Sequence, residues 1–220
     1  MITALNIINP DIPALSPSED PNNALSLMDQ YRVAHLPVVE KGKFLGMASE
    51  TAMLSAGEVV SDPDMHYTNL IDGSVEPDEH ILEVLKSASE LHLTAIPVVD
   101  KTGNFLGCVT LEDLVEKLSQ MQGADRPGGI IVLEMAEHDY SLQQIARIVE
   151  ENNAKILSTS VSPGDAGQIE VNLKISNPDV NAILQSFSRF NYNIKGSYQE
   201  PVYTEDMRKR YEELMRYLNI

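Results

Sequence analysis

Residues 95–113 read Ala-Ile-Pro-Val-Val-Asp-Lys-Thr-Gly-Asn-Phe-Leu-Gly-Cys-Val-Thr-Leu-Glu-Asp, and residues 35–52 read His-Leu-Pro-Val-Val-Glu-Lys-Gly-Lys-Phe-Leu-Gly-Met-Ala-Ser-Glu-Thr-Ala. Both stretches contain Pro-Val-Val followed by Phe-Leu-Gly. The first run recurs at an offset of 60 residues and the second at 61, so the additional residue falls in the turn between two apolar runs. A duplicated hairpin tolerates such a change at its turn. The chain therefore contains a repeated unit of about sixty residues.

Each repeat predicts the same order of elements: a short strand, a helix, a β-hairpin and a second helix. The first helix has a strong start signal, because Ser16 can cap it, Pro17 stands at its first position and Glu19 follows three residues after the cap. The predicted strands and hairpins are bounded by turn residues. The elements cover 12–15, 16–30, 36–40, 44–48 and a helix after Ser49 in the first repeat, and a strand near 70–71, then 77–91, 96–99, 105–109 and 111–121 in the second.

The pattern changes after residue 122. The segment 123–128 is a predicted linker, because Gly and Pro break the preceding helix there. Beyond it, strand, helix, strand, strand, helix and strand are predicted over 130–135, 141–152, 156–161, 169–175, 177–190 and 194–198. This order is typical of the βαββαβ ferredoxin-like fold. A tail helix is predicted within 200–220, with a docking stripe formed by Met207, Tyr211, Leu214 and Leu218.

Composition and charge restrict the class of protein. The chain has 220 residues, 43% of them apolar and 22% charged, as expected for a folded protein. It opens with no signal-like segment, and its single Cys108 lies in an apolar run, so we expect a soluble cytoplasmic protein with a buried thiol. The net charge is −17, and residues 1–122 hold 6 Lys and Arg against 19 Asp and Glu. This excludes nucleic acid and anionic membranes as main partners, because both bind through clustered basic residues.

The duplicated motif resembles the CBS (cystathionine-β-synthase) domain pair, also called a Bateman module. Each repeat has Pro-Val-Val, then Phe-Leu-Gly, then a hydroxyl residue, and in the second repeat an acid follows three residues after the hydroxyl. The carboxy-terminal part resembles an ACT-type regulatory domain, and the order of the two is similar to the acetoin utilisation (AcuB) family. The resemblance implies an α+β protein with a CBS pair at 1–122, in repeats of about 1–60 and 61–122, and an ACT-like domain at 129–199.

The resemblance also implies a function. Such proteins are non-catalytic regulators that sense an adenosine nucleotide (AMP, ADP or ATP), form homodimers and signal to a protein partner, here with a possible link to acetoin or short-chain carbon metabolism. Two other interpretations stay open: an interaction or dimerisation scaffold with vestigial sites, and a small enzyme. The enzyme is disfavoured because the sequence contains no nucleophile elbow, P-loop or dinucleotide fingerprint.

The resemblance assigns candidate ligand residues. It places a ribose on Thr110 and Asp113, and adenine against Val33, Ala34, Thr94 and Ala95. Thr-x-x-Asp is also a plain capping box, in which Thr110 caps a helix and the negative charge of Asp113 interacts favourably with the positive end of the helix dipole. Both interpretations of Thr110 and Asp113 therefore stay open.

The first repeat predicts a degenerate second site. Ser49 matches the hydroxyl position, but Ala52 stands where the acid is expected, and His35 is a possible phosphate contact. The five histidines show no ligand spacing, so we predict no metal site and no resident cofactor.

Overall fold

The computed structural model of the chain describes residues 1–56, 67, 69–199 and 217. The chain divides into two compact units, Met1–Lys117 and Leu118–Ile220, and each is described by itself below. The predicted tail helix and its stripe lie outside the described residues, as does the connector at 57–66. The domain limits drawn from the sequence stay a prediction.

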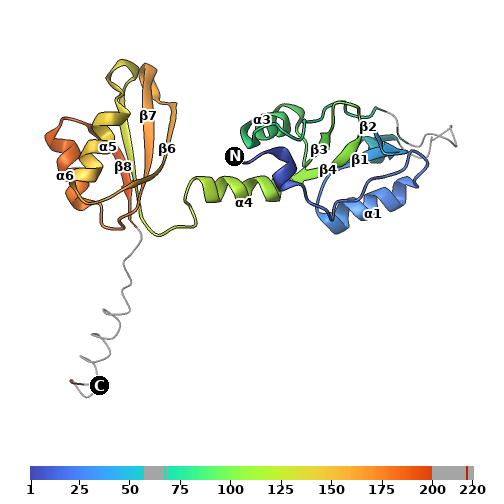
Figure 1. Cartoon of the computed structure of the whole chain (residues 1–220), viewed down its shortest axis with the longest axis horizontal. Coiled ribbons are helices and arrows are strands. Elements are labelled where there is room, and N and C mark those ends of the chain that lie inside the picture. The colour runs from blue at the N-terminus through green and yellow to red at the C-terminus, as the bar shows by residue number, and fades with distance from the viewer. Residues whose placement is uncertain (57–66, 68, 200–216, 218–220) are drawn as a thin grey trace. The chain divides into compact units, whose positions relative to one another are not determined.

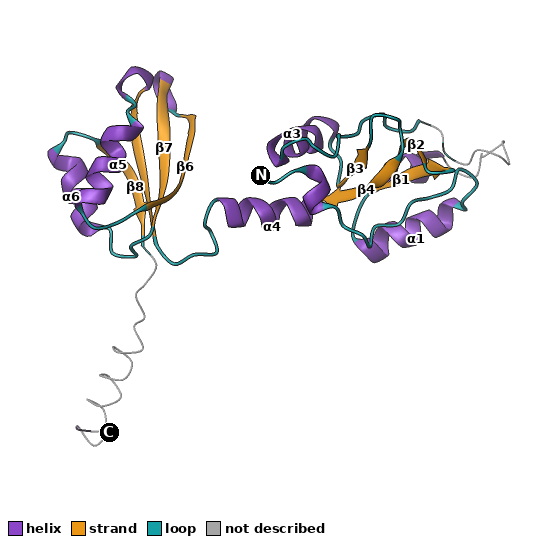
Figure 2. Ribbon diagram, in the orientation of Figure 1, coloured by secondary structure: helices purple, strands orange, loops and turns teal. Residues whose placement is uncertain are grey.

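Two antiparallel hairpins form the centre of the first unit (Figures 1 and 2). Each hairpin has the same irregularity, a register shift at Val38/Val39 in the first and at Val98/Val99 in the second. The repeat predicted from the sequence is therefore confirmed in the backbone. The elements are a 3-10 turn at Ala4–Ile7, α1 (Pro21–Tyr31), β1 (His35–Glu40), β2 (Lys43–Ser49), α2 (Glu50–Ala56), α3 (Ile81–Leu91), β3 (Ala95–Val99), β4 (Phe105–Thr110) and α4 (Leu111–Met121).

The two repeats exchange segments at the edges of their hairpins. Asn9, from the start of the chain, forms an antiparallel bridge to Cys108 of the second hairpin, and Ile71 forms one to Met47 of the first. The predicted strands at 12–15 and 70–71 are thus reduced to single bridges, because only Leu15 and Ile71 pair with a neighbour there. Each repeat is completed by residues from the other, so the pair folds as one body.

The glycine of each Phe-Leu-Gly motif allows these crossings. Gly46 and Gly107 have φ values of 147° and 146°, which side-chain-bearing residues rarely adopt. A Cβ on Gly107 would lie 2.5 Å from Cγ2 of Ile8, and one on Gly46 would lie 2.7 Å from Cβ of Leu70. The motif therefore marks where a segment of the other repeat passes over the hairpin.

The start predicted for the first helix of each repeat is wrong by about one turn. In α1 the cap is Asp20, whose Oδ1 accepts from the backbone N–H of Asn22 at 2.9 Å, and Pro21 stands at the first helical position. Ser16 instead closes a turn, in which its carbonyl accepts from Glu19 N–H at 3.0 Å. The second repeat repeats the error, since α3 begins at Ile81 after the cap His80 rather than at 77. There the Glu76 carbonyl accepts from Glu79 N–H at 3.1 Å, so in both repeats the residue before Pro closes a turn that precedes the helix.

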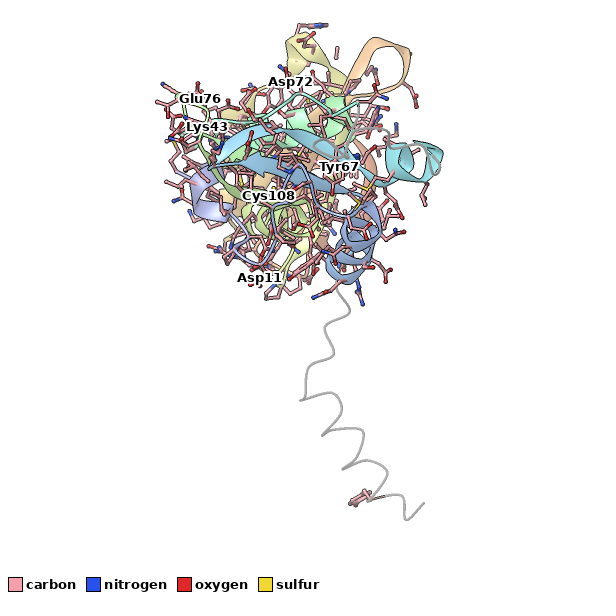
Figure 3. The ribbon with its side chains drawn as sticks, turned by 90° about the vertical axis from the view of Figure 1, so that its right-hand side faces the viewer. Asp11, Lys43, Tyr67, Asp72, Glu76 and Cys108 are labelled. Carbon is pink, nitrogen blue, oxygen red and sulfur yellow. The ribbon has the colours of Figure 1, made fainter. Side chains whose placement is uncertain are left out.

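The core of the first unit lies between the hairpins and the helices. Phe44 and Phe105, one from each Phe-Leu-Gly motif, stack with centroids 6.4 Å apart. Cys108 is fully buried in β4, and burial raises the pKa of its thiol well above the usual range. Figure 3 shows Cys108 within the unit and Asp11 at its edge. The expected buried thiol is confirmed.

The second unit has the predicted βαββαβ order. All strand pairs of its four-stranded sheet are antiparallel, in the order β6-β7-β5-β8. Both helices lie on one face of the sheet (Figure 2). The helix predicted from 177 begins four residues later, because Asn177 and Asp179 each accept a backbone N–H two residues on and form turns. The elements are β5 (Gly129–Ala136), α5 (Leu142–Glu151), β6 (Ile156–Pro163), β7 (Gln168–Ile175), α6 (Asn181–Arg189) and β8 (Asn193–Tyr198), with 3-10 turns at Glu137–Asp139 and Asp165–Gly167.

The sheet of this unit has two unlike faces. The face under the helices carries the core, including Ile131, Leu133 and Phe187, all fully buried. On the other face, the Lys195 ammonium lies 2.6 Å from a Glu170 oxygen and 3.1 Å from a Glu134 oxygen. These hydrogen bonds raise the pKa of Lys195. The outer face therefore carries a polar, ion-paired centre.

Candidate functional site

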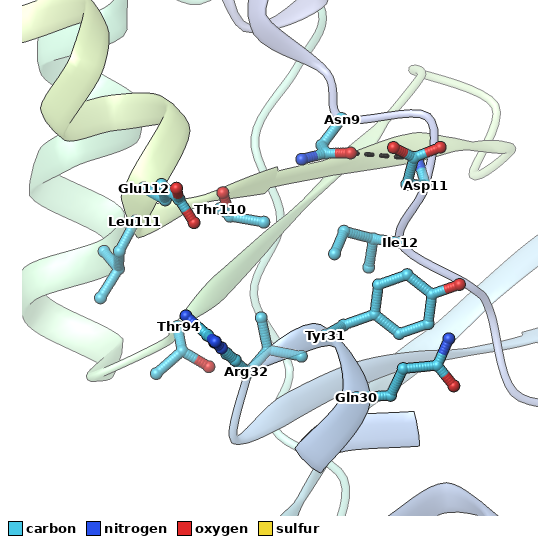
Figure 4. A pocket seen from close by; sticks show the side chains of 11 residues that line it. Asn9, Asp11, Ile12, Gln30, Tyr31, Arg32, Thr94, Thr110, Leu111 and Glu112 are labelled. Carbon is cyan, nitrogen blue, oxygen red and sulfur yellow. Dashed lines mark hydrogen bonds between the residues drawn. The ribbon is translucent and has the colours of Figure 1, made fainter. Parts of the chain in front are cut away.

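A pocket of about 500 Å³ opens in the first unit (Figure 4). Its wall comes from the amino-terminal segment, the end of α1, the residue before β3 and the start of α4. Three predicted ligand residues line it: Val33, Thr94 and Thr110. The full lining is Asn9, Asp11, Ile12, Gln30, Tyr31, Arg32, Val33, Thr94, Thr110, Leu111 and Glu112. Ala34, Ala95 and Asp113 are chain neighbours of lining residues, so the predicted set gathers at one place.

Thr110 and Asp113 form the capping box at the start of α4. The hydroxyl oxygen of Thr110 accepts from Asp113 N–H at 3.1 Å, and Asp113 Oδ2 accepts from Thr110 N–H at 3.0 Å. The Thr110 hydroxyl also donates to the same Oδ2. These hydrogen bonds are those of a capping box. Binding of a ribose would in addition require that a carboxylate oxygen of Asp113 can still accept a hydrogen bond.

Asn9 also contacts this carboxylate, which the sequence reasoning missed. Its side-chain amide donates to Asp113 Oδ2 at 3.2 Å and lies 3.4 Å from Oδ1. Oδ2 thus has three donors, whereas Oδ1 has one long contact, so Oδ1 is the oxygen that can still accept a ligand hydroxyl. The sequence carried one signal for this residue, since the repeat register places Asn69 at the equivalent position.

Two further hydrogen bonds hold Asn9 in its turn. Its backbone N–H donates to the Cys108 carbonyl at 2.8 Å, and its side-chain oxygen accepts from Asp11 N–H at 3.0 Å, the bond drawn in Figure 4. The amino-terminal segment therefore orients Asp113 from outside its own helix.

His35, Ala34 and Thr94 meet at the junction of the two repeats. Nδ1 of His35 lies 3.1 Å from the Thr94 hydroxyl and accepts the Thr94 backbone N–H at 3.3 Å. The same hydroxyl oxygen accepts from Ala34 N–H at 2.8 Å. Burial lowers the pKa of His35, and the nearby Glu50 carboxylate opposes that shift. His35 is thus a neutral bridge between the repeats, with Nε2 as the nitrogen left for any ligand.

In the first repeat, Ser49 serves as a helix cap. Its hydroxyl accepts from Ala52 N–H at 3.1 Å at the start of α2. Ala52 offers no carboxylate where Asp113 stands in the second repeat. The degenerate second site stays a prediction. The cap at the start of α2 is sufficient to explain why a hydroxyl residue stands at position 49.

Neither a membrane span nor a metal cluster is found in the part of the chain that the structure describes. No described helix is both long and apolar enough to cross a bilayer. Within residues 1–56, 67, 69–199 and 217, no group of three or more His, Cys, Asp or Glu side chains is placed to hold a metal ion.

Comparison with known proteins assigns the first unit. The CBS domain family model matches residues 4–59 and 64–120, which together make up just over half of the chain. An inosine-5'-monophosphate dehydrogenase of Thermoplasma acidophilum is 24% identical over 170 residues, covering 76% of this chain. The chain spans only 34% of that relative's length. The CBS domain-containing protein YhcV of Bacillus subtilis is 27% identical over 121 residues, covering 52% of this chain and 84% of its own.

Among solved structures, a Vibrio cholerae protein described as an acetoin utilization protein (AcuB) is similar to this chain. It is 25% identical, with a TM-score of 0.47, and the match covers 58% of this chain and 99% of that one. The tandem match of the family model agrees with the duplicated motif, the paired hairpins and the exchanged edge segments. The chain therefore belongs to the CBS domain family.

Proposed function

We propose that this protein is a non-catalytic regulator whose CBS pair binds an adenosine nucleotide in the pocket of the first unit. The observation that supports the proposal is the pocket itself, which brings Val33 of one repeat together with Thr94 and Thr110 of the other. These are residues that the family resemblance assigns to ligand binding. Val33 is separated from Thr94 and Thr110 by more than sixty positions in sequence, and all three line one cavity.

In the proposed complex, adenine lies against Val33 and Thr94, and the ribose lies at the start of α4. Val33 is 7% exposed and Ile12 is 8% exposed, so the pocket offers an apolar wall for a flat base. Oδ1 of Asp113 accepts a ribose hydroxyl, while Oδ2 continues to cap the helix. Both interpretations of Thr-x-x-Asp are then compatible.

The position of the pocket gives a route for the signal. A ligand there contacts both repeats, which Thr94 and His35 already connect by hydrogen bonds. It also contacts Leu111 and Glu112 at the first turn of α4, the helix that leads out of the first unit. We propose that ligand occupancy is passed on to a partner through α4 and through a homodimer. A role in acetoin or short-chain carbon metabolism is part of this proposal and rests on the family resemblance alone.

The second candidate function is an interaction scaffold. It is favoured by the fact that Asp113 already has partners in Thr110 and Asn9. In that case the pocket is a remnant, and Thr110 and Asp113 only start a helix.

A nucleotide panel distinguishes the two functions. Thermal unfolding and calorimetric titration of the full chain are measured with adenosine, AMP, ADP and ATP. Ligand at a hundred times its dissociation constant stabilises the folded state by about 2.7 kcal/mol. We expect saturable binding of at least one of these ligands. If none binds and none shifts the unfolding temperature, the scaffold is the correct function.

A further inference from the structure

The charged side chains around the pocket restrict which adenosine ligand it can take. Of the eleven lining residues, all within the described part of the chain, the charged ones are Asp11, Arg32 and Glu112. The lining therefore contains two carboxylates and one guanidinium. Asp113 adds a further carboxylate directly behind Thr110. The wall of the pocket is acidic overall, in agreement with the excess of Asp and Glu in residues 1–122.

The start of α4 is poorly suited to bind a phosphate. Helix amino termini bind phosphate when their N–H groups are free and the dipole is uncompensated. Here Thr110 N–H donates to Asp113, Asp113 N–H donates to the Thr110 hydroxyl, and Leu111 N–H donates to the Thr94 carbonyl at 3.2 Å. The first turn also contains Glu112 and Asp113, whose charges offset the dipole.

A single cation remains in the wall to meet an anionic group. Arg32 ends α1 in the left-handed conformation, with φ 54°, and its exposed side chain belongs to the lining. One guanidinium can pair with one phosphate or carboxylate. A second or third phosphate would meet Asp11 or Glu112 without a counter-charge in this wall.

We infer that the pocket selects adenosine ligands whose 5′ substituent is uncharged, cationic or a single phosphate paired with Arg32, and that it discriminates against di- and triphosphates. This inference rests on the proposed function for the binding of the adenosine moiety. The charge selectivity is inferred from the charged residues of the pocket wall. A sulfonium-bearing adenosine such as S-adenosylmethionine matches the wall in sign, since its two cationic groups meet two carboxylates and its carboxylate meets Arg32.

The test is a calorimetric titration of the full chain without divalent cations. The ligands are adenosine, S-adenosylmethionine, AMP, ADP and ATP. We expect the dissociation constant to rise about threefold for each phosphate after the first, which is the size expected for partly screened charges. S-adenosylmethionine should bind at least as tightly as AMP, and the differences should shrink as salt is added.

Two variants and a matched control test whether the charged residues of the pocket wall cause the selectivity. Glu112→Gln should reduce the ratio of the ATP to the adenosine dissociation constant about threefold, because it removes one facing carboxylate. Arg32→Gln should weaken AMP more than adenosine. Glu83→Gln changes an exposed glutamate in the first turn of α3, which does not line the pocket, and should leave the ratio unchanged.

The experiment distinguishes a failure of the charge selectivity from a failure of nucleotide binding. If ADP or ATP binds more tightly than adenosine, or if Glu112→Gln leaves the ratio unmoved, the charge selectivity is wrong while nucleotide sensing stands. If no ligand of the panel binds, nucleotide sensing itself fails, and the charge inference fails with it.

Discussion

At the scale of single residues, Asp113 combines two tasks that a substitution can separate. Its Oδ2 atom is engaged by Thr110 and Asn9, while Oδ1 has a single contact at 3.4 Å. The sequence identified Thr110 and Asp113 because the motif is local, only four residues long. The register of the repeats marks Asn9 only through its equivalent Asn69, and no local pattern predicts that Asn9 reaches Asp113 across 104 positions through the exchange of edge segments.

Asp113→Ala should weaken nucleotide binding at least tenfold. A charge-assisted hydrogen bond to ribose contributes roughly 1.5–3 kcal/mol. The variant also loses the reciprocal bond of the capping box, from Thr110 N–H to Asp113, at a cost of about 1 kcal/mol of folding stability. Asp20→Ala is the control, since Asp20 caps α1 with a 2.9 Å bond and does not line the pocket. Calorimetry should show weakened binding for Asp113→Ala only, and equal affinity in both variants would leave Asp113 as a cap.

His35 should make folding stability depend on pH. Its folded pKa is lowered from 6.5 by burial, so the unfolded chain takes up the proton first. The stabilisation by neutral His35 is therefore fully present above pH 6.5 and is lost as the pH falls toward the folded pKa. Urea unfolding of the wild type and of His35→Gln, measured from pH 8 to about 5, gives the difference curve.

In that comparison, groups that do not interact with His35 contribute equally to both proteins, and the difference reports His35 together with its interaction with the Glu50 carboxylate. We expect the advantage of the wild type over His35→Gln to decrease below pH 6.5. A difference that is constant with pH would show that His35 does not bridge the repeats in its neutral form.

At the scale of elements, the sequence predicted best what is local and repeated. Both hairpins and α4 are confirmed, since Pro-Val-Val and Phe-Leu-Gly recur in register and apolar spacing marks the helix. The first helix of each repeat starts later than predicted because Ser16-Pro17 and Glu76-Pro77 form turns, in which the Ser16 and Glu76 carbonyls each accept the backbone N–H three residues on. The exchange of edge segments involves contacts between distant parts of the chain, which no local pattern records.

Gly107→Ala should destabilise the first unit more than Gly103→Ala does. Both glycines have positive φ, 146° and 82°. A Cβ at Gly103 has its nearest neighbour at 4.0 Å, whereas one at Gly107 meets Ile8 Cγ2 at 2.5 Å. The strained backbone costs about 1–2 kcal/mol in either variant, and overpacking adds about 1–3 kcal/mol at Gly107.

The clash has a direct check in the double variant Gly107→Ala, Ile8→Ala. Removing Cγ2 of Ile8 should relieve the overpacking, so the double variant should lose less stability than the sum of the two single variants. Free energies of unfolding from urea titrations measure all four proteins. Simple additivity would contradict a crossing of the amino-terminal segment over Gly107.

At the scale of the whole molecule, the pseudo-symmetry of the pair raises the question of how many ligands it holds. The two repeats are alike in backbone but differ in chemistry. Ser49 is followed by Ala52, whereas Thr110 is followed by Asp113. A repeated fold does not therefore imply a repeated site.

The wild-type chain should bind one nucleotide or fewer. The first repeat lacks the carboxylate that would accept ribose hydroxyls, and its Ser49 hydroxyl already caps α2. Calorimetric stoichiometry measures this directly. Ala52→Asp restores the missing acid and is the variant in which we expect a second binding event. Two equivalent ligands per wild-type chain would show that the acid is dispensable.

The chain should be a dimer in solution, and the reason lies in apolar surface that the described residues leave open. Val115 on α4 is 67% exposed, and Tyr198 on β8 is 64% exposed beside its cross-strand neighbour Ile130. The ion-paired Lys195 cluster on the outer face of the sheet limits how much of that face can pack against an apolar mate. A twofold contact through the apolar residues would cover surface that a monomer leaves exposed.

The response to salt distinguishes this dimer from a charge-driven one. A net charge of −17 on each copy repels at long range, so the contact must be apolar, and screening should leave it unchanged or strengthen it. Light scattering at low micromolar concentration should give twice 24.3 kDa in both low and high salt. A mass near 24.3 kDa under both conditions would contradict the predicted dimer. It would also contradict the proposal that ligand occupancy is transmitted between two copies of this chain.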